Sequence, residues 1–184
     1  MVYIKKLVLQ HKLLFSLIFL YFLFIFFFMV LTWVMRSNFK KYPIEELVQH
    51  HFWSEIFYQN VTSSLFIISL GIITLGFLSI FVSLYNLYTF ILAIDTAYKI
   101  SESYAYSFFI IMGHGLIEIP AIATTLYIST ISLRILINRI YQKPIFKIES
   151  IKSFTTMVFC VIFMFLVASI LESYITPTLV KLTL

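Results

Sequence analysis

Long uncharged apolar runs, separated by short polar segments, set the pattern of this chain. The first run covers residues 13–35 and contains no charged residue. A helix rises about 1.5 Å per residue, so this run can cross a bilayer core of about 30 Å. Lys5, Lys6 and Lys12 precede it. The pattern predicts a first transmembrane helix that is retained as an anchor, because its apolar region is longer than that of a secretory signal.

A mixed segment follows, in which charged and apolar residues recur with approximately helical spacing over residues 43–58. Pro43 suits the first position of a helix, and Trp53 favours the interface between membrane and water. We expect an amphipathic helix that lies in this interface. His50 and His51 are interpreted as solvated residues of that helix rather than as metal ligands, because adjacent side chains on a helix point to different faces.

The next apolar run, residues 61–94, also contains no charged residue. As one helix it would be about 51 Å long and would overshoot the hydrocarbon core. Two short spans over approximately 61–82 and 84–96 fit better. Ser83 and Asn86 are polar and offer a turn between the two spans.

The following run, residues 104–133, holds an imidazole and a carboxyl near its middle. His114 and Glu118 are four residues apart, so they share one face of an α-helix. Ionisable groups within a membrane segment cost roughly 2.5–3.5 kcal/mol on insertion scales, so they mark a functional site or a polar contact between helices. These two residues are the first candidates for a functional site.

Residues that disfavour a regular helix lie next to His114 and Glu118. Gly113 and Gly115 flank the histidine, and Pro120 follows Glu118 two residues later. Glycine is conformationally free, and proline cannot donate a helical hydrogen bond. These residues predict a broken or kinked central helix. A re-entrant segment stays open as an alternative, because irregular backbone is tolerated at membrane depth where protein surrounds it.

A last apolar run predicts a fifth span over approximately 154–176, with Glu172 near its far end. Basic residues cluster in the connection before it, namely Arg134, Arg139, Lys143, Lys147 and Lys152. With five spans, this loop and the N-terminus lie on one side and together hold eight of the 13 basic residues. The positive-inside tendency then places the N-terminus in the cytoplasm and the C-terminus outside.

Composition supports a single all-α polytopic membrane domain over residues 1–184. Hydrophobic residues make up 61% of the chain and charged residues 11%, and the mean hydropathy is +1.01. The net charge of +5 is explained by topology and by anionic lipid, so we expect no nucleic-acid partner. Cys160 lies in an apolar run, where a thiol acts as a small hydrophobic group. The sequence assigns no cofactor.

Three ordered segments resemble the stage II sporulation protein M family of bacterial membrane proteins. Residues 113–121 read Gly-His-Gly-Leu-Ile-Glu-Ile-Pro-Ala and resemble that family's Pro-His-Gly-x-x-Glu-x-Pro-Ala signature, with glycine at the first proline. Asn60 followed by Gly71 and Gly76 is similar to its asparagine-then-glycine second span. Residues 168–177 resemble its closing segment, in which a glutamate precedes Thr-Pro. The resemblance implies a five-span fold without established enzymatic chemistry, and a role in spore engulfment or in circular bacteriocin systems.

Five residues form the predicted intramembrane polar cluster: His114, Glu118, Glu172, Asn60 and Asn86. The first hypothesis is a non-enzymatic subunit or scaffold in which they set helix register and partner choice. The second is a proton- or ion-coupled transporter with Glu118 as the protonatable site. The third is an intramembrane hydrolase, with Glu118 activating water or with zinc held by His114, Glu118 and a third ligand.

Partners follow from the same features. The bilayer is the first, and membrane proteins or further copies of this chain are the next. A cytoplasmic ATPase is a partner that the basic segment 134–152 could recruit. The chain is small and carries no soluble domain, so our narrower expectation is bacteriocin production, export or immunity, and a sporulation component is the alternative.

Overall fold

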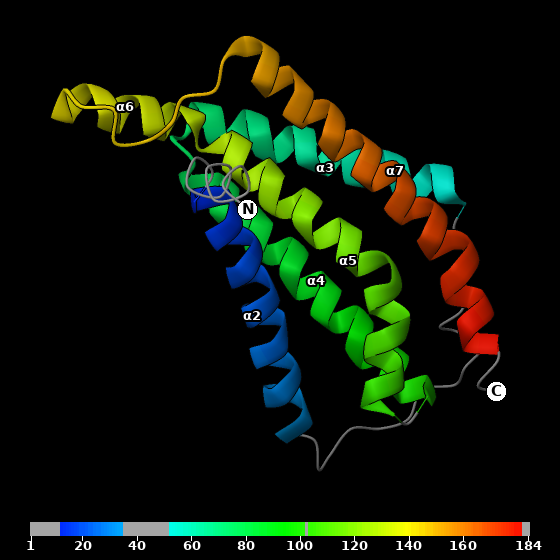
Figure 1. Cartoon of the computed structure of the whole chain (residues 1–184). Helices are drawn as coiled ribbons and strands as arrows, with labels where there is room; N and C mark the ends of the chain where they lie inside the picture. The colour runs from blue at the N-terminus through cyan, green and yellow to red at the C-terminus, as the bar shows by residue number, and fades with distance from the viewer. Residues whose placement is uncertain (1–11, 35–51, 102, 182–184) are drawn as a thin grey trace, which may run out of the picture.

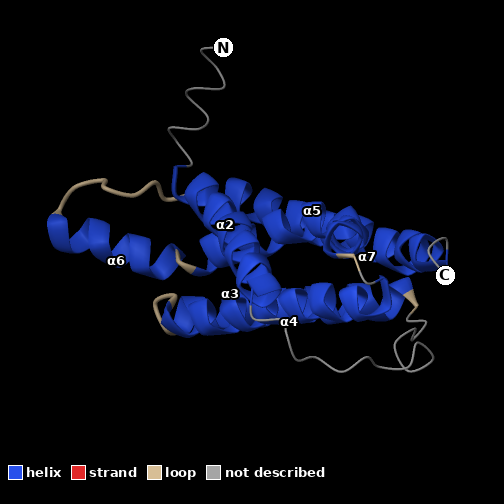
Figure 2. Cartoon of the chain, turned by 90° about the horizontal axis from the view of Figure 1, so that it is seen from below, coloured by secondary structure: helices blue, strands red, loops and turns tan. Residues whose placement is uncertain are grey.

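The computed structural model of the chain describes residues 12–34, 52–101 and 103–181. Helices make up nearly all of these residues, and no strand occurs among them, so the predicted all-α class is confirmed. The helices are α2 (Lys12–Val34), α3 (Trp53–Ile73), α4 (Phe77–Ser101), α5 (Tyr104–Ser129), α6 (Ile131–Tyr141) and α7 (Ile151–Lys181). Five of them form a bundle, from whose end α6 extends as an arm (Figures 1 and 2).

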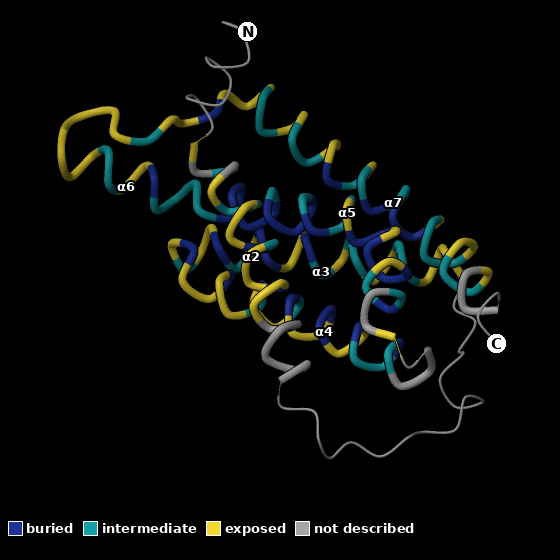
Figure 3. Tube along the Cα trace, turned by 60° about the horizontal axis from the view of Figure 1, so that its bottom comes forward, coloured by how far each residue is buried: buried dark blue, intermediate teal, exposed yellow. Residues whose placement is uncertain are grey.

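Helix α5 is the centre of this bundle. It packs against α2, α3, α4 and α7. Within its apolar segment 61% of the residues are buried, against 33% or less in the other long apolar helices, and the burial colours of Figure 3 follow the same division. Its buried hydroxyls, such as those of Thr125 and Ser129, donate to carbonyls of their own helix. These bonds satisfy polar groups that apolar surroundings would otherwise penalise.

Among the described residues, four helices are long and apolar enough to cross a membrane. These segments are Trp53–Ile73, Phe77–Tyr98, Tyr106–Ser129 and Ile151–Thr178. The first predicted span coincides with α2, in which Ser16–Phe27 forms a shorter apolar stretch of described side chains. Large apolar side chains such as Phe66, Phe81 and Phe159 are exposed on the outer faces. This distribution suits a membrane protein whose outer surface meets lipid.

The predicted turn at Ser83 and Asn86 is wrong. The chain reverses at residues 74–76, where Leu75 and Gly76 have φ values of 55° and 84°. The amide of Gly76 donates to the carbonyl of Gly71 at 2.7 Å and closes the end of α3. Two successive left-handed residues reverse a chain in little space, and glycine adopts that conformation without strain.

Ser83 and Asn86 lie inside α4 instead, where each makes a contact between helices. Ser83 is fully buried and hydrogen-bonds the hydroxyl of Tyr21 in α2. The Nδ2 atom of Asn86 donates to Oγ of Ser63 in α3 at 3.3 Å. Their polarity therefore serves helix packing rather than a turn.

The central helix was predicted to be broken or kinked, and of these two alternatives the break does not occur. Helix α5 continues through Gly113, Gly115 and Pro120, and its ribbon in Figure 1 bends without an interruption. Its far end was also misplaced, because the predicted span 104–133 stops at Thr130. From there α6 begins as a separate amphipathic helix.

The interfacial helix predicted over residues 43–58 falls largely outside the described residues. Its last part is described, and there the structure differs from the prediction. Trp53 begins α3, so residues 53–58 are the first turns of a spanning helix. Glu55 is exposed there and belongs to the lining of a cavity between the helices.

Candidate functional site

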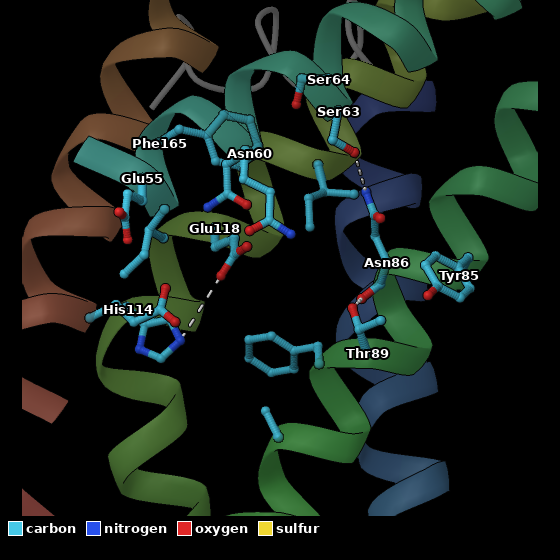
Figure 4. A pocket seen from close by; sticks show the side chains of 16 residues that line it. Glu55, Asn60, Ser63, Ser64, Tyr85, Asn86, Thr89, His114, Glu118 and Phe165 are labelled. Carbon is cyan, nitrogen blue, oxygen red and sulfur yellow. Dashed lines mark hydrogen bonds and ion pairs between the residues drawn. The ribbon is translucent and has the colours of Figure 1, made fainter. Parts of the chain in front are cut away.

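A polar cavity of about 350 Å³ lies between α3, α4, α5 and α7 (Figure 4). We call it the vestibule. Its polar lining comes from all four helices and comprises Glu55, Gln59, Asn60, Ser63, Ser64, Tyr85, Asn86, Thr89, His114, Glu118 and Glu172. All five residues of the predicted polar cluster are in this group.

The vestibule runs inward from one end of the bundle. Glu55 lies in the first turn of α3, and Ser64 lies nine residues further along the same helix, which corresponds to a depth of about 13 Å. The turn at residues 74–76 makes α3 and α4 antiparallel neighbours, so the start of α3 and the end of α4 are at the same end. Ile122 and Phe165, which are 6% and 2% exposed, line its inner part. A polar entrance therefore leads to an apolar inner wall.

His114 and Glu118 face each other in the vestibule because they are one helical turn apart. The imidazole Nε2 atom lies 4.0 Å from a carboxylate oxygen of Glu118, as Figure 4 shows. His114 is 5% exposed, and the ring of Phe90 meets its ring edge-on with a centroid separation of 6.3 Å. The imidazole is thus held between a carboxylate and an aromatic wall.

Glu172 reaches the same point from α7. One ligand atom from each of His114, Glu118 and Glu172 lies within 4.8 Å of the others. Four residues beyond Glu172, the hydroxyl oxygen of Thr176 lies 3.3 Å from Nδ1 of His114. Two positions one turn apart on α7 therefore flank the two ionisable residues of α5. We refer to His114, Glu118 and Glu172 as the carboxylate–histidine triad.

The chemistry available to this triad is cation binding or proton sharing. Two carboxylates offer up to four oxygen acceptors, and a neutral imidazole offers one lone pair. Among the described residues, these three form the group of histidine and acidic side chains close enough to hold a metal ion. Asn60 and Asn86 add amide groups to the lining without joining the triad.

Sequence reasoning missed part of the vestibule lining. Glu55, Gln59 and Ser63 were not assigned to a site, although they recur every four residues and so share one face of α3. This polar stripe on an otherwise apolar helix was a usable signal. It was hidden because the N-terminal part of α3 was interpreted as an interfacial helix.

A second polar cluster, also missed, lies where α5, α6 and the start of α7 meet. Arg134, in α6, is 3% exposed and donates from Nη1 to Glu149 at 2.7 Å and to the carbonyl of Lys147 at 2.8 Å. Its guanidinium lies 4.1 Å from the ring centroid of Tyr127, whose hydroxyl donates to Glu149. We call Arg134, Glu149 and Tyr127 the arm-base cluster.

This cluster changes the interpretation of the basic segment 134–152. The segment is not one loop, because α6 ends at Tyr141 and α7 begins at Ile151. Arg134 is buried in an ion pair, whereas Arg139, Lys143 and Lys147 are exposed. The Nδ2 atom of Asn138 donates to the carbonyl of Phe146 at 2.7 Å, and its Oδ1 atom accepts from the amide of Phe146 at 2.8 Å. These two bonds hold the loop after α6 against that helix.

Comparison with known proteins gives one match. The model of the family described as stage II sporulation protein M matches residues 16–177, which include α3 to α5, the vestibule lining and the arm-base cluster. No curated protein and no solved structure was found to match this chain.

Proposed function

Because the chain belongs to the stage II sporulation protein M family, we propose that it is a non-enzymatic subunit of a membrane complex, with the vestibule as its partner-binding site. One observation carries this proposal: a polar cavity at membrane depth is lined by residues of four helices. Polar groups at such depth favour partners that supply complementary hydrogen-bond donors and acceptors. A membrane segment carrying polar residues is the class of partner that fits.

The side wall of the vestibule is consistent with a partner that approaches from within the bilayer. Tyr85 and Thr89 line the cavity and are also exposed on α4. Both lie well inside the apolar segment of that helix. A partner helix beside α4 would therefore contact apolar side chains and reach the polar lining at the same time.

Photocrosslinking in native membranes tests this role. A photoreactive amino acid at Tyr85 is expected to give one discrete adduct with a second membrane protein. Phe159, on the outer face of α7, is a control with similar exposure, 67% against 64%, and no vestibule contact. Identical adducts at both positions would contradict a partner site at the vestibule.

Proton- or ion-coupled transport is the second candidate, and the triad favours it. Glu118 and Glu172 are carboxylates inside spanning helices, the class of residue that carries protons in many transporters. Protein reconstituted in vesicles with an internal pH dye would then show a flux that Glu118→Gln abolishes. An unchanged proton flux in this variant would contradict the transport role. Absence of flux in the parent protein would contradict it as well, and both results would favour the subunit role.

The arm formed by α6 supplies the proposed cytoplasmic contact. Its exposed basic residue Arg139 and the exposed Lys143 and Lys147 that follow the helix suit an acidic patch on an ATPase or an anionic lipid surface. Reversing these charges should weaken vesicle binding if lipid is the partner, and ATPase co-purification if protein is.

The cellular pathway is proposed by analogy with small family members. Bacteriocin production, export or immunity is the first choice, and spore engulfment is the alternative. A neighbouring peptide-precursor gene and ATPase gene would support the first. Neighbouring genes for peptidoglycan processing would support the second.

A further inference from the structure

We propose that His114, Glu118 and Glu172 bind a divalent transition-metal ion, such as Zn²⁺, which joins α5 to α7. This goes beyond the subunit role and does not depend on it, because the ion would be held within this chain. Three observations carry the proposal: the distances within the triad, its charge in buried surroundings, and the neighbour of the imidazole.

The distances suit a metal after small side-chain shifts. Three atoms that all lie within 4.8 Å of one another have a point no more than about 2.8 Å from each. Zinc–oxygen and zinc–nitrogen bonds are about 2.0–2.2 Å. Each ligand atom therefore has to move by at most about 0.6–0.8 Å, which rotation about the terminal torsions of two glutamates and one histidine supplies.

Charge favours a divalent ion over an empty triad. Two carboxylates this close repel each other, and the apolar surroundings strengthen the repulsion. His114 is 5% exposed and the side chain of Glu118 is 15% exposed. A divalent cation cancels both negative charges, whereas a monovalent cation leaves one uncompensated. Imidazole with carboxylates is a ligand set that zinc accepts, with water in the remaining position.

The imidazole also has the neighbour that a metal-bound histidine requires. Its Nε2 atom faces Glu118, whereas Nδ1 lies 3.3 Å from the hydroxyl of Thr176. In the tautomer that donates from Nδ1 to Thr176, the Nε2 lone pair points toward the triad. Metal-binding histidines commonly use the second ring nitrogen in this way.

Metal titration of detergent-purified protein tests the proposal. After removal of bound metal with a chelator, we expect one Zn²⁺ per chain by calorimetry and by elemental analysis. Substitution with Co²⁺ is expected to give visible absorption bands that report nitrogen and oxygen ligands. Protein that remains folded but binds neither ion would overturn the proposal.

Variants locate the ion. Glu172→Gln and His114→Gln should each abolish the stoichiometric ion and change the Co²⁺ spectrum. Glu55→Gln is the matched control, because Glu55 lines the same cavity outside the triad. A second control replaces His50 and His51 with Gln and should retain the ion. Unchanged binding in the triad variants would overturn the site, and Glu172→Asp, which keeps the charge, should retain weakened binding if the protein folds.

Discussion

The hydroxyl oxygen of Thr176 in α7 lies 3.3 Å from Nδ1 of His114 in α5, a contact across 62 residues of chain. It links the family's closing Thr-Pro segment to the Gly-His-Gly segment and fixes the direction in which the imidazole faces. Two sequence motifs that lie far apart in the chain therefore form one structural unit, and Glu172, one turn before Thr176, belongs to it.

Removing this contact should reduce stability slightly and metal binding more. Thr176→Val keeps the side-chain shape but loses the hydroxyl, so the free energy of unfolding should fall by about 0.6–1.7 kcal/mol, the usual range for polar contacts between membrane helices. The affinity for Zn²⁺ should fall by about 10–100-fold, as for other neighbours of metal ligands. Denaturant unfolding in detergent and calorimetry measure the two effects.

Thr178→Val is the control for that variant. The hydroxyl of Thr178 is exposed and donates only to the carbonyl of Tyr174 in its own helix, at 2.7 Å. It should change neither stability nor affinity noticeably. Equal effects of the two variants would show that Thr176 does not act through His114.

Two glycines of the chain should respond oppositely to alanine. A Cβ atom at Gly71 would lie 2.4 Å from Cβ and 2.6 Å from the backbone oxygen of Ser129, so Gly71→Ala has to push α3 away from α5. Overpacking of this kind costs about 1–3 kcal/mol. At Gly113 nothing lies within 4 Å of the added atom, and alanine favours helix more than glycine does. Gly113→Ala should be neutral or stabilising.

Thermal unfolding of both variants checks this pair. The result also tests the helical conformation at Gly113, because a break there would need the freedom of glycine. A marked loss of stability in Gly113→Ala would indicate that α5 departs from a regular helix at this point.

The sequence predicted the helical class and the main apolar segments, because each rests on a strong local signal. The five polar residues of the predicted cluster line one cavity. Run length fixes a span, and an intramembrane carboxyl stands out against apolar neighbours. Turns were harder. Ser83 and Asn86 have the polarity of turn residues, yet they bond to α2 and α3, and this tertiary use cannot be read from their own segment.

At Pro120 the helix bends without the break that was predicted as one alternative, for a related reason. Proline removes one backbone donor, but the surrounding helix can continue when neighbouring helices hold it. Helix α5 packs against α2, α3, α4 and α7, so the helix bends and continues. The local propensity of proline predicted a weak point in the backbone of α5, and packing against the neighbouring helices kept the helix continuous.

The arm-base cluster should be the most sensitive polar contact outside the vestibule. Arg134 and Glu149 have side chains that are 3% and 2% exposed, so removal of one partner leaves a buried charge. Arg134→Met and Glu149→Gln should each lower the free energy of unfolding by about 3–5 kcal/mol. Denaturant unfolding in detergent measures this loss.

The double variant provides the decisive comparison. Removing both charges together should cost clearly less than the sum of the single losses, because no buried charge then lacks its partner. Lys143→Ala, at an exposed position, is the control and should change stability little. Additive single losses would mean that the two residues act independently.

Water access along the polar stripe of α3 gives the last prediction. Cys160 is the one cysteine in the sequence, so Cys160→Ser provides a background for labelling single cysteines. Glu55→Cys and Gln59→Cys face the vestibule and should react with a membrane-impermeant thiol reagent, fastest at position 55 near the entrance. Phe66→Cys is the control on the same helix, because this side chain is 55% exposed on the outer face and should stay unreactive in lipid.

Intact cells and inverted vesicles then distinguish the two sides. The predicted orientation places the start of α3 outside, so the reagent should label intact cells. Labelling confined to inverted vesicles would reverse the orientation while keeping the vestibule. Equal reactivity at positions 55, 59 and 66 would instead show that the stripe does not line a separate aqueous path, and both the partner site and the entry route for a metal ion would then lose their basis.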